Sequence, residues 1–551
     1  MIKRTGYLER PWVVNLVGCL FLMAMAGYLS IFRGQDANFD LKNYHWYNAY
    51  AFLEGRLGFD IAPAQLQTFH NPLLDVPYYW LATSFPDYPA YPALLEGSYY
   101  GLLVFFLIKC ALLLLPSSTG ARPPSVKLTE GSDSIGLAVQ LPVRPLMLLI
   151  AVAIGATGVA TVSQFGTTMN EIPVAALVMA GFYCLLVSIG TVRPVRWIIW
   201  SAFLIGAAAG LKLTAATYGV GAVCALSVVA YRQGWPKKWL AHFMLALFSG
   251  FLVFQGHWML KLYTDFDNPM FPYYNDIFAS DWWAQTSLKT TPFLPRDIWQ
   301  WLFYPFYWMK LNYSLVTEGA FRDPRVAVTF LALIMIAAKL RKPAAGSAKE
   351  KDMWWLLIMF VTVSYIAWMA MFSIYRYLIP VEAMSGLALV GAFRWLGSRK
   401  IIILAPLSCL IMATTIYLDW GHVAFSPGVI AADEVPQIPS NSLVMLMGGD
   451  PKAYVIPSFP KGVRFIGIGN NLIRPGMGNR LQRQADMAIQ KHDGEIFFIE
   501  SRAADKSKND GYLAYYNLQR GDCMPLNTTL ESDWLNFCKA HYQTSGTSRR
   551  Q

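Results

Sequence analysis

Long apolar runs, separated by short polar segments, make up most of the first 420 residues. By hydropathy we distinguish about eleven runs, most of them close to the roughly 20 residues that cross a bilayer core. They lie near residues 12–32, 97–115, 145–163, 172–190, 196–210, 214–231, 239–260, 326–340, 354–372, 379–396 and 400–418. The pattern predicts an α-helical polytopic membrane protein, with polar loops at residues 33–96 and 261–325.

The pattern changes after residue 420. Three short apolar segments, "SLVMLMGG" (442–449), "VRFIGIG" (463–469) and "EIFFIES" (495–501), are typical of buried strands, and "GNRLQRQADMAIQKH" (478–492) has helical periodicity. Strands alternating with helices predict a small α/β domain with a parallel sheet. We therefore divide the chain into a transmembrane module (1–420) and an α/β domain (421–551). No GxGxxG fingerprint follows the Gly-Gly pair at 448–449, so a nucleotide site is not indicated.

Charge placement predicts the orientation in the membrane. The net charge is +11, but the cations cluster in every second segment between apolar runs, which is the positive-inside pattern. This places the N-terminus in the cytosol, and an odd number of spans places the α/β domain outside. We expect a bacterial inner-membrane protein with a periplasmic C-terminal domain. The excess of basic residues is therefore explained by the orientation in the membrane and does not indicate a nucleic-acid partner.

Two of the seven cysteines, Cys523 and Cys538, lie in the C-terminal domain. An outside compartment permits disulfides, and we predict one here. Their spacing alone does not show that the two Cα atoms meet.

The segment "NFDLKNYHWYNAYAFLEGR" (38–56) follows the first apolar run directly. We predict a helix beginning near Phe39, with Asp40 at the N-cap and Tyr44 and Tyr47 on one face. One interpretation is that Asp40 only caps a helix on the membrane surface, whose aromatic residues form an interfacial belt. The other is that Asp40 is a functional carboxylate.

Several cations share this outer side. Arg376, in "FSIYRYLIP" (372–380), lies in a very short junction between two apolar runs. Its guanidinium could form two hydrogen bonds to a phosphate or extend to lipid headgroups. Lys212, in "GLKLTAATY" (210–218), is costly between apolar runs unless it is paired or interfacial; it could simply end a turn. Arg322 and Arg325, in "TEGAFRDPR" (317–325), could pair with acids of their own loop. The remaining polar residues that map to this side are Asp36, His45, His70 and Asp75.

These features resemble the GT-C superfamily of polytopic glycosyltransferases, which use lipid-phosphate sugar donors. The resemblance rests on the acid after the first span, the outer loop "NPMFPYYN" (268–275), the basic-aromatic "YRYLIP" (375–380) and the outside C-terminal domain. It covers most of residues 1–420 and implies juxtamembrane helices at 41–56 and 66–81. It also implies that Asp40 is the catalytic base, with Asp36 as the competing match.

The implied reaction moves a sugar from a polyprenyl-phosphate donor to a glycan, lipid or protein acceptor outside the cytosol. A positioned carboxylate can activate the acceptor hydroxyl, cations can stabilise the departing phosphate, and direct displacement would invert the anomeric centre. For the donor phosphate we expect Arg376, Lys212, Arg322 and Arg325. For the sugar or acceptor we expect Tyr44, His45, Tyr47, His70, Glu318 and Tyr377.

We expect no cofactor and no metal, because cations already surround the site. Asp36 and Asp40 at i, i+4 could nevertheless share a divalent ion. Two other function classes stay open. A transporter or flippase of lipid-linked sugars would need polar residues along a path at mid-membrane depth. A non-catalytic envelope assembly protein would leave the Asp40 and Arg376 segments without a role.

Overall fold

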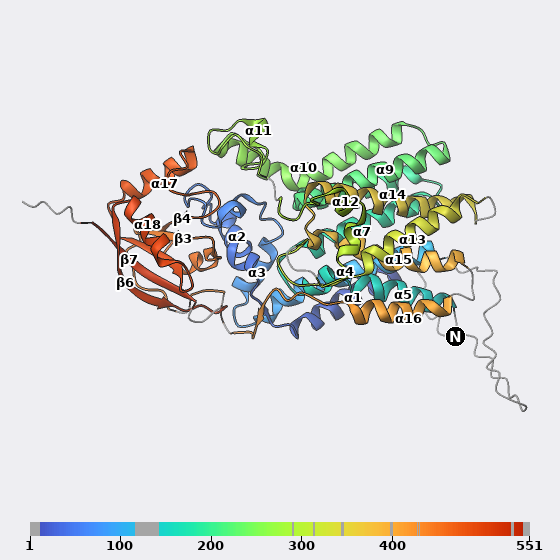
Figure 1. The fold of residues 1–551 in the computed structure, drawn as a ribbon, viewed down its shortest axis with the longest axis horizontal. Coiled ribbons are helices and arrows are strands. Elements are labelled where there is room, and N and C mark those ends of the chain that lie inside the picture. Colours follow the sequence, from blue (N-terminus) through green and yellow to red (C-terminus); the bar gives the residue numbers. More distant parts are fainter. Residues whose placement is uncertain are drawn as a thin grey trace, which may run out of the picture.

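The computed structural model describes residues 11–115, 143–288, 291–311, 315–342, 346–396, 401–426, 428, 430–432, 434–530 and 534–543. A body of long helices forms one end of the molecule and a small sheet with its helices forms the other (Figure 1). The predicted loops 33–96 and 261–325 are named the first and second outer segments, and the short helices of the first lie between these two ends. The basic clusters at 1–10 and 116–142, on which part of the predicted orientation rests, lie outside the described residues.

Eight helical stretches within the described residues are long and apolar enough to cross a membrane. Three shorter helices, at 143–156, 325–340 and 401–414, account for the other predicted runs, so the predicted polytopic helical fold is confirmed. The eight stretches are α1 (Pro11–Ile31), α4 (Ala90–Leu114), α7 (Glu171–Ser188), α8 (Pro194–Leu211), η3 (Leu213–Ala215) with α9 (Ala216–Gln233), α10 (Lys238–Phe266), α14 (Ala348–Met371), and η4 (Tyr375–Leu378) with α15 (Ile379–Leu396). The shorter ones are α5 (Val143–Ala156), α13 (Arg325–Leu340) and α16 (Ile401–Thr414).

Small residues set the closest helix crossings. A Cβ added at Gly206 of α8 would lie 2.0 Å from the Leu247 carbonyl oxygen of α10, and one at Gly250 would lie 2.2 Å from the Phe203 carbonyl oxygen. Such contacts are typical of membrane helices, whose association depends on close backbone packing. The predicted run 145–163 is divided because α5 ends at Ala156 and α6 (Val159–Ser163) begins after Gly158. Gly158 lies against the Glu382 side chain, where a Cβ would clash at 2.2 Å.

The first outer segment contains four short elements: η1 (Leu41–His45), α2 (Trp46–Leu53), η2 (Gln65–Phe69) and α3 (Val76–Ser84). η1 is a single π-helical turn and continues into α2. The predicted helix at 41–56 is thus present in outline. The predicted helix at 66–81 is instead broken into η2 and α3, because Asn71 precedes Pro72, and the residue before a proline disfavours helical backbone. The second outer segment contains α11 (Asn275–Phe278) and α12 (Ile298–Tyr307).

The C-terminal domain has a five-stranded sheet in the order β4-β3-β5-β7-β6. β3 (Leu443–Met447), β4 (Arg464–Ile468) and β5 (Ile496–Ser501) are parallel, as predicted, and α17 (Arg480–Gln490) and α18 (Lys506–Tyr515) alternate with them. The sheet is mixed rather than wholly parallel, because β6 (Leu518–Leu526) and β7 (Leu535–Tyr542) form a hairpin that joins β5 antiparallel. Cys523 and Cys538 face each other across that hairpin and are disulfide-bonded.

The first outer segment also joins the C-terminal domain through a buried ion pair. Arg56 donates to both Asp60 carboxylate oxygens (2.7 Å each) and to the carbonyls of Lys461 and Val463 beside β4 (2.7 Å each). Asp60 also accepts from the Phe465 N–H of β4 (2.9 Å). A second link is the short pair of β1 (Gln35–Asp36) with β2 (His422–Val423).

We expect Arg56→Ala to destabilise this junction by about 3–5 kcal/mol, because it leaves the Asp60 carboxylate buried and unpaired. Thermal unfolding of the purified chain and limited proteolysis at 420–442 would show the loss. Lys461→Ala is the matched control. Its pair with Glu54 is exposed to solvent, and such pairs contribute little to stability, so this variant should unfold much like the wild type. Equal effects of the two variants would contradict the assignment.

Candidate functional site

Asp40 and Arg376 form an ion pair close to the ends of membrane helices. The Asp40 Oδ2 atom lies 3.0 Å from an Arg376 terminal nitrogen, and both side chains are largely buried. The expected N-cap role of Asp40 is wrong. Asp40 has helical backbone angles and makes no capping hydrogen bond within the described chain, and Asn38 accepts from the Leu41 N–H instead (2.8 Å). The cap thus lies two residues before Asp40, at Asn38, and the Asp40 carboxylate pairs with Arg376.

A second ion pair lies against the first. Lys212 donates to Glu171 Oε1 (2.5 Å) and to the Met169 carbonyl (2.6 Å), and Arg376 Nε lies 3.7 Å from the same Glu171 oxygen. The four side chains come from the residue before η1, the start of α7, the α8–α9 junction and η4. Two carboxylates thus balance two cations in a mostly buried setting. Glu171 was not predicted; the available signal was an acid at the start of an apolar run, in "TTMNEIPV" (167–174).

His45 is the last residue of the π-helical turn that follows Asp40. Its Nδ1 atom is 2.7 Å from Asp75 Oδ1, and both side chains are almost fully buried. Asn170 donates its side-chain amide to the same Asp75 oxygen (2.6 Å). Asn170 has a left-handed backbone (φ +68°) directly before Glu171. Non-glycine residues in this region are uncommon and cluster at functional sites.

Aromatic side chains surround the charged groups. Tyr44 packs on the His45 ring (3.9 Å between centroids) and edge-on against His70 (5.3 Å). His70 shares a hydrogen bond with the Tyr273 hydroxyl (3.0 Å). The Tyr377 ring lies 5.5 Å from the Arg376 guanidinium carbon and 5.9 Å from Lys212 Nζ, which are cation–π distances.

The charges decide which groups are ionised. Burial opposes ionisation of Asp40, but nearby positive charge, chiefly that of Arg376, outweighs it and lowers the pKa of Asp40. Burial, with Lys212 nearby, lowers the pKa of His70 to about 3, so its ring is neutral at physiological pH. Burial and the Asp40 charge raise the pKa of Tyr44 well above its usual value, so the hydroxyl stays protonated.

Three polar atoms around these pairs are buried without a hydrogen-bond partner among the described residues. They are Arg376 Nε, Glu171 Oε2 and His45 Nε2. Unsatisfied buried polar groups are rare and costly in folded proteins. Each of these three atoms could form a hydrogen bond with a bound polar group.

The other residues predicted for the site are placed differently. The Asp36 carboxylate accepts from the Asn38 amide (2.7 and 2.8 Å) and from the Thr168 N–H and hydroxyl (2.8 Å each), so it ties two outer segments together. Tyr47 donates to Asp60 (3.0 Å) and belongs to the junction with the C-terminal domain. Glu318 is among the acids whose charge acts on Arg376.

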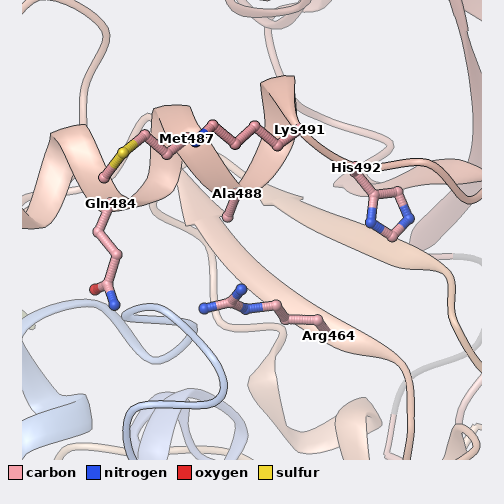
Figure 2. A pocket seen from close by; sticks show the side chains of 6 residues that line it. All are labelled: Arg464, Gln484, Met487, Ala488, Lys491 and His492. Carbon is pink, nitrogen blue, oxygen red and sulfur yellow. The ribbon is translucent and has the colours of Figure 1, made fainter.

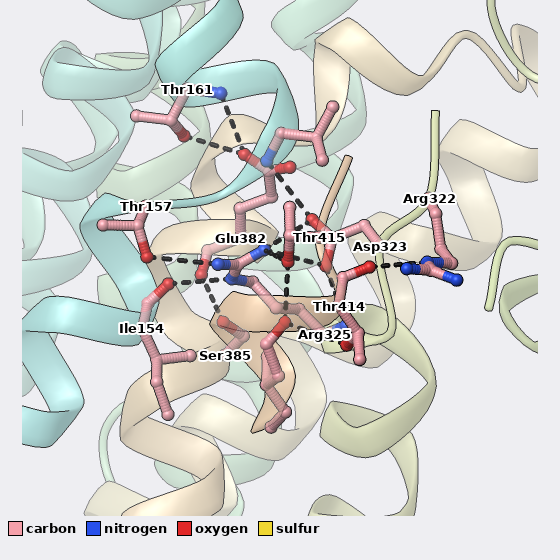
Figure 3. Close-up of polar contacts among 12 residues, drawn as sticks. Ile154, Thr157, Thr161, Arg322, Asp323, Arg325, Glu382, Ser385, Thr414 and Thr415 are labelled. Atoms are coloured by element: carbon pink, nitrogen blue, oxygen red, sulfur yellow. Dashed lines mark hydrogen bonds and ion pairs between the residues drawn. The ribbon is translucent and has the colours of Figure 1, made fainter. Parts of the chain in front are cut away.

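Arg322 and Arg325 lie in a separate cluster (Figure 3). Arg325 is fully buried and donates to both Asp323 oxygens (3.0 Å) and to the hydroxyls of Thr157 (3.1 Å) and Thr415 (3.0 Å). Arg322 donates to the Thr414 carbonyl (2.5 Å). Arg325 therefore pairs with an acid of its own "TEGAFRDPR" segment, which is one of the two predicted alternatives. The pair is buried, whereas the prediction placed it on a solvated loop. We leave both arginines out of the site.

No family model matches the sequence, and no curated protein matches it. Among solved structures, the chain is similar to ArnT from Cupriavidus metallidurans, crystallised with bound undecaprenyl phosphate. The two chains are 12% identical. The match covers 97% of this chain and 98% of that one, with a TM-score of 0.47. At this identity no residue role is transferred from one chain to the other.

Two further features bear on ligands. Among the described residues, no group of three His, Cys, Asp or Glu side chains could hold a metal ion. Asp36 hydrogen-bonds Asn38 and Thr168, whereas Asp40 pairs with Arg376.

An open cavity of about 400 Å³ lies between α17 and β4 in the C-terminal domain (Figure 2). Its lining residues are Arg464, Gln484, Met487, Ala488, Lys491 and His492, and none of them belongs to the Asp40 site.

Proposed function

We propose that this chain is a membrane glycosyltransferase that moves a sugar from a polyprenyl-phosphate donor to an acceptor hydroxyl at the outer face of a bacterial inner membrane. The observation that carries the proposal is the Asp40–Arg376 ion pair beside the Lys212–Glu171 pair. A carboxylate and two cations are thus joined where spans of the chain begin and end, which is where the headgroup of a membrane-anchored donor lies.

The donor phosphate would bind between Arg376 and Lys212. A guanidinium can form two parallel hydrogen bonds to a phosphate, and Arg376 Nε is buried without a hydrogen-bond partner among the described residues. In the free chain the carboxylates of Asp40 and Glu171 neutralise these cations. A phosphate that replaces them would release the Asp40 carboxylate toward the acceptor, so donor binding would also prepare the base.

The reaction then needs one proton transfer and one displacement. Asp40 accepts the proton of the acceptor hydroxyl. The acceptor oxygen forms its bond to the anomeric carbon as the bond from that carbon to the phosphate oxygen breaks, and the electron pair leaves on the phosphate. Arg376 and Lys212 stabilise that growing negative charge. Attack from the side opposite the phosphate inverts the anomeric centre.

The sugar and acceptor would lie among the aromatic residues of the site. The Tyr44 ring contacts the rings of His45 and His70. The Tyr377 ring lies at cation–π distance from Arg376. Tyrosine hydroxyls and a neutral imidazole can hydrogen-bond sugar hydroxyls. No nucleotide site is required, because the phosphate-linked donor is already activated.

A reconstituted transfer assay tests the proposal. The purified full-length chain in proteoliposomes would receive a panel of radiolabelled polyprenyl-phosphate hexoses and pentoses, with a bacterial envelope extract as the acceptor source. We expect label to leave the lipid and free polyprenyl phosphate to appear. Movement of intact labelled lipid to the other leaflet would instead indicate a flippase. No change in any donor would indicate an assembly protein, and either result would overturn the proposal.

A further inference from the structure

The turn that carries Arg376 is short, and hydrogen bonds fix its backbone. η4 is a single 3-10 turn that follows Ser373, whose backbone is left-handed (φ +52°). A non-glycine residue keeps this conformation only where the surrounding structure holds it. The Ser373 hydroxyl donates to the Met369 carbonyl (2.9 Å), and the Tyr375 N–H donates to the Val316 carbonyl (2.7 Å). The entry into η4 is therefore held from both α14 and the second outer segment.

The Tyr375 side chain connects this turn to the buried cluster around Asp323 (Figure 3). Its hydroxyl donates to Asp323 Oδ2 (2.9 Å), and both side chains are almost fully buried. The same carboxylate accepts from Arg325 (3.0 Å to each oxygen) and from the Val159 N–H (3.2 Å). A hydrogen bond to an ionised acceptor is stronger than one between neutral groups. The Tyr375 hydroxyl is thus bound to a carboxylate that is itself fixed from two other directions.

Two further contacts hold the turn from its other sides. Glu382, in the first turn of α15 directly after η4, accepts from the N–H groups of Ala160 and Thr161 (3.0 Å each) and from the Thr161 hydroxyl (2.8 Å). The Tyr218 hydroxyl of α9 donates to the Tyr377 carbonyl (2.5 Å). The orientation of η4 is therefore set by bonds to α6, to α9 and to the Asp323 cluster.

We propose that Tyr375 and Tyr218 are positioning residues for Arg376, and that their hydroxyls fix the rotation of η4 and so place the guanidinium where the donor phosphate binds. A 3-10 helix has three residues per turn, so neighbouring side chains point about 120° apart. While Tyr375 points into the Asp323 cluster, Arg376 points to Asp40 (3.0 Å). This inference rests on the proposed glycosyltransferase function. It gives the buried cluster a role behind the site rather than in it.

Tyr375→Phe tests the positioning role, because it removes only the hydroxyl and keeps the ring against Trp308 (5.1 Å between centroids). A misplacement of about 1 Å by a distant change can cost 10²-fold in rate. We therefore expect a higher KM for donor and a lower kcat in the proteoliposome assay, with kcat/KM reduced about 10- to 10²-fold. The decrease should be smaller than that of Arg376→Gln.

Tyr365→Phe is the matched control. Its ring faces the same Trp308 side chain (6.4 Å), and its hydroxyl is buried without a hydrogen-bond partner among the described residues. Both substitutions thus remove one buried hydroxyl from a ring beside Trp308, but only Tyr375 is bonded to the Asp323 cluster. Tyr365→Phe should have the kcat and KM of the wild type. A loss equal to that of Tyr375→Phe would overturn the positioning role.

A double-mutant cycle separates positioning from a merely structural role. A residue that acts through Arg376 should have no further effect once Arg376 is replaced. Tyr375→Phe should therefore weaken the binding of a fluorescent polyprenyl phosphate in nanodiscs about 10-fold in the wild-type background and not at all in the Arg376→Gln background. A structural role would instead lower the melting temperature in both backgrounds without this dependence. Equal losses of affinity in both backgrounds would overturn the inference.

The outcomes also separate this inference from the proposed function. If the wild type binds polyprenyl phosphate but transfers no sugar, the proposed function fails and the binding cycle alone decides the positioning role. If the wild type binds no polyprenyl phosphate, both fail. If the wild type transfers sugar and Tyr375→Phe keeps its kcat and KM, only the positioning role is overturned. Should Tyr375→Phe not fold, Tyr218→Phe decides by the same cycle, and an unchanged affinity would overturn the inference.

Discussion

Asp40→Asn is expected to abolish measurable sugar transfer while the protein folds and still binds its donor. The amide keeps the shape of the carboxylate but cannot accept the acceptor proton. Loss of a general base costs roughly 10²–10⁴-fold in rate. The measurement is the initial rate in proteoliposomes at saturating donor. Because Asn38, not Asp40, caps the helical turn, the substitution leaves the cap intact and isolates the catalytic role.

Asp419→Asn is the matched control for Asp40→Asn. Its side chain is 81% exposed and lies outside the site, so its transfer rate should equal that of the wild type. Donor affinity of Asp40→Asn should be unchanged or higher, since Arg376 loses a competing carboxylate. A variant that transfers sugar at the wild-type rate would remove Asp40 from the reaction and leave it as the counter-ion of Arg376.

Arg376→Gln is expected to impair both donor binding and turnover. The donor phosphate is present in the ground state and carries more charge in the transition state, so losing the guanidinium raises the KM for donor and also lowers kcat. Removing one such charge-stabilising group costs about 10²–10³-fold in kcat in comparable sites. Donor titrations in the proteoliposome assay, with kcat and KM fitted separately, would measure both effects.

Two companion variants sharpen the Arg376 test. Arg376→Lys should recover only part of the activity, because an ammonium cannot fork onto a phosphate as a guanidinium does. Arg480→Gln removes an arginine whose side chain is 51% exposed in the C-terminal domain, and its kinetics should match the wild type. A rise in KM alone for Arg376→Gln, with kcat intact, would show that Arg376 only holds the donor.

The membrane architecture could be predicted from the sequence because it depends on a one-dimensional quantity. A helix must be apolar over the thickness of the bilayer wherever it crosses, and each predicted run has its helix in the structure. The same reasoning predicted that Asp40, Lys212 and Arg376 lie at one depth. The three parallel strands of the C-terminal domain and α17 between them were also readable from periodicity.

The antiparallel hairpin of that domain was not predicted. Strand direction depends on which strands meet in space, and β7 reaches β5 from a later part of the chain. The cap at Asp40 was misplaced for a related reason. Asn38 and Asp40 are comparable capping residues; in the structure Asn38 caps the turn, and Asp40 pairs with Arg376, which lies 336 positions away along the chain.

The sequence by itself predicted the apolar helices and the charged residues near their ends. Only the tertiary structure decided which charges meet. It pairs Asp40 with Arg376, adds Glu171 and the His45–Asp75 pair, and keeps Arg325 in a buried cluster with Asp323. The physical reason is that hydropathy fixes the position of a residue along the membrane normal, whereas helix rotation and packing, which hydropathy does not encode, fix its neighbours within the plane.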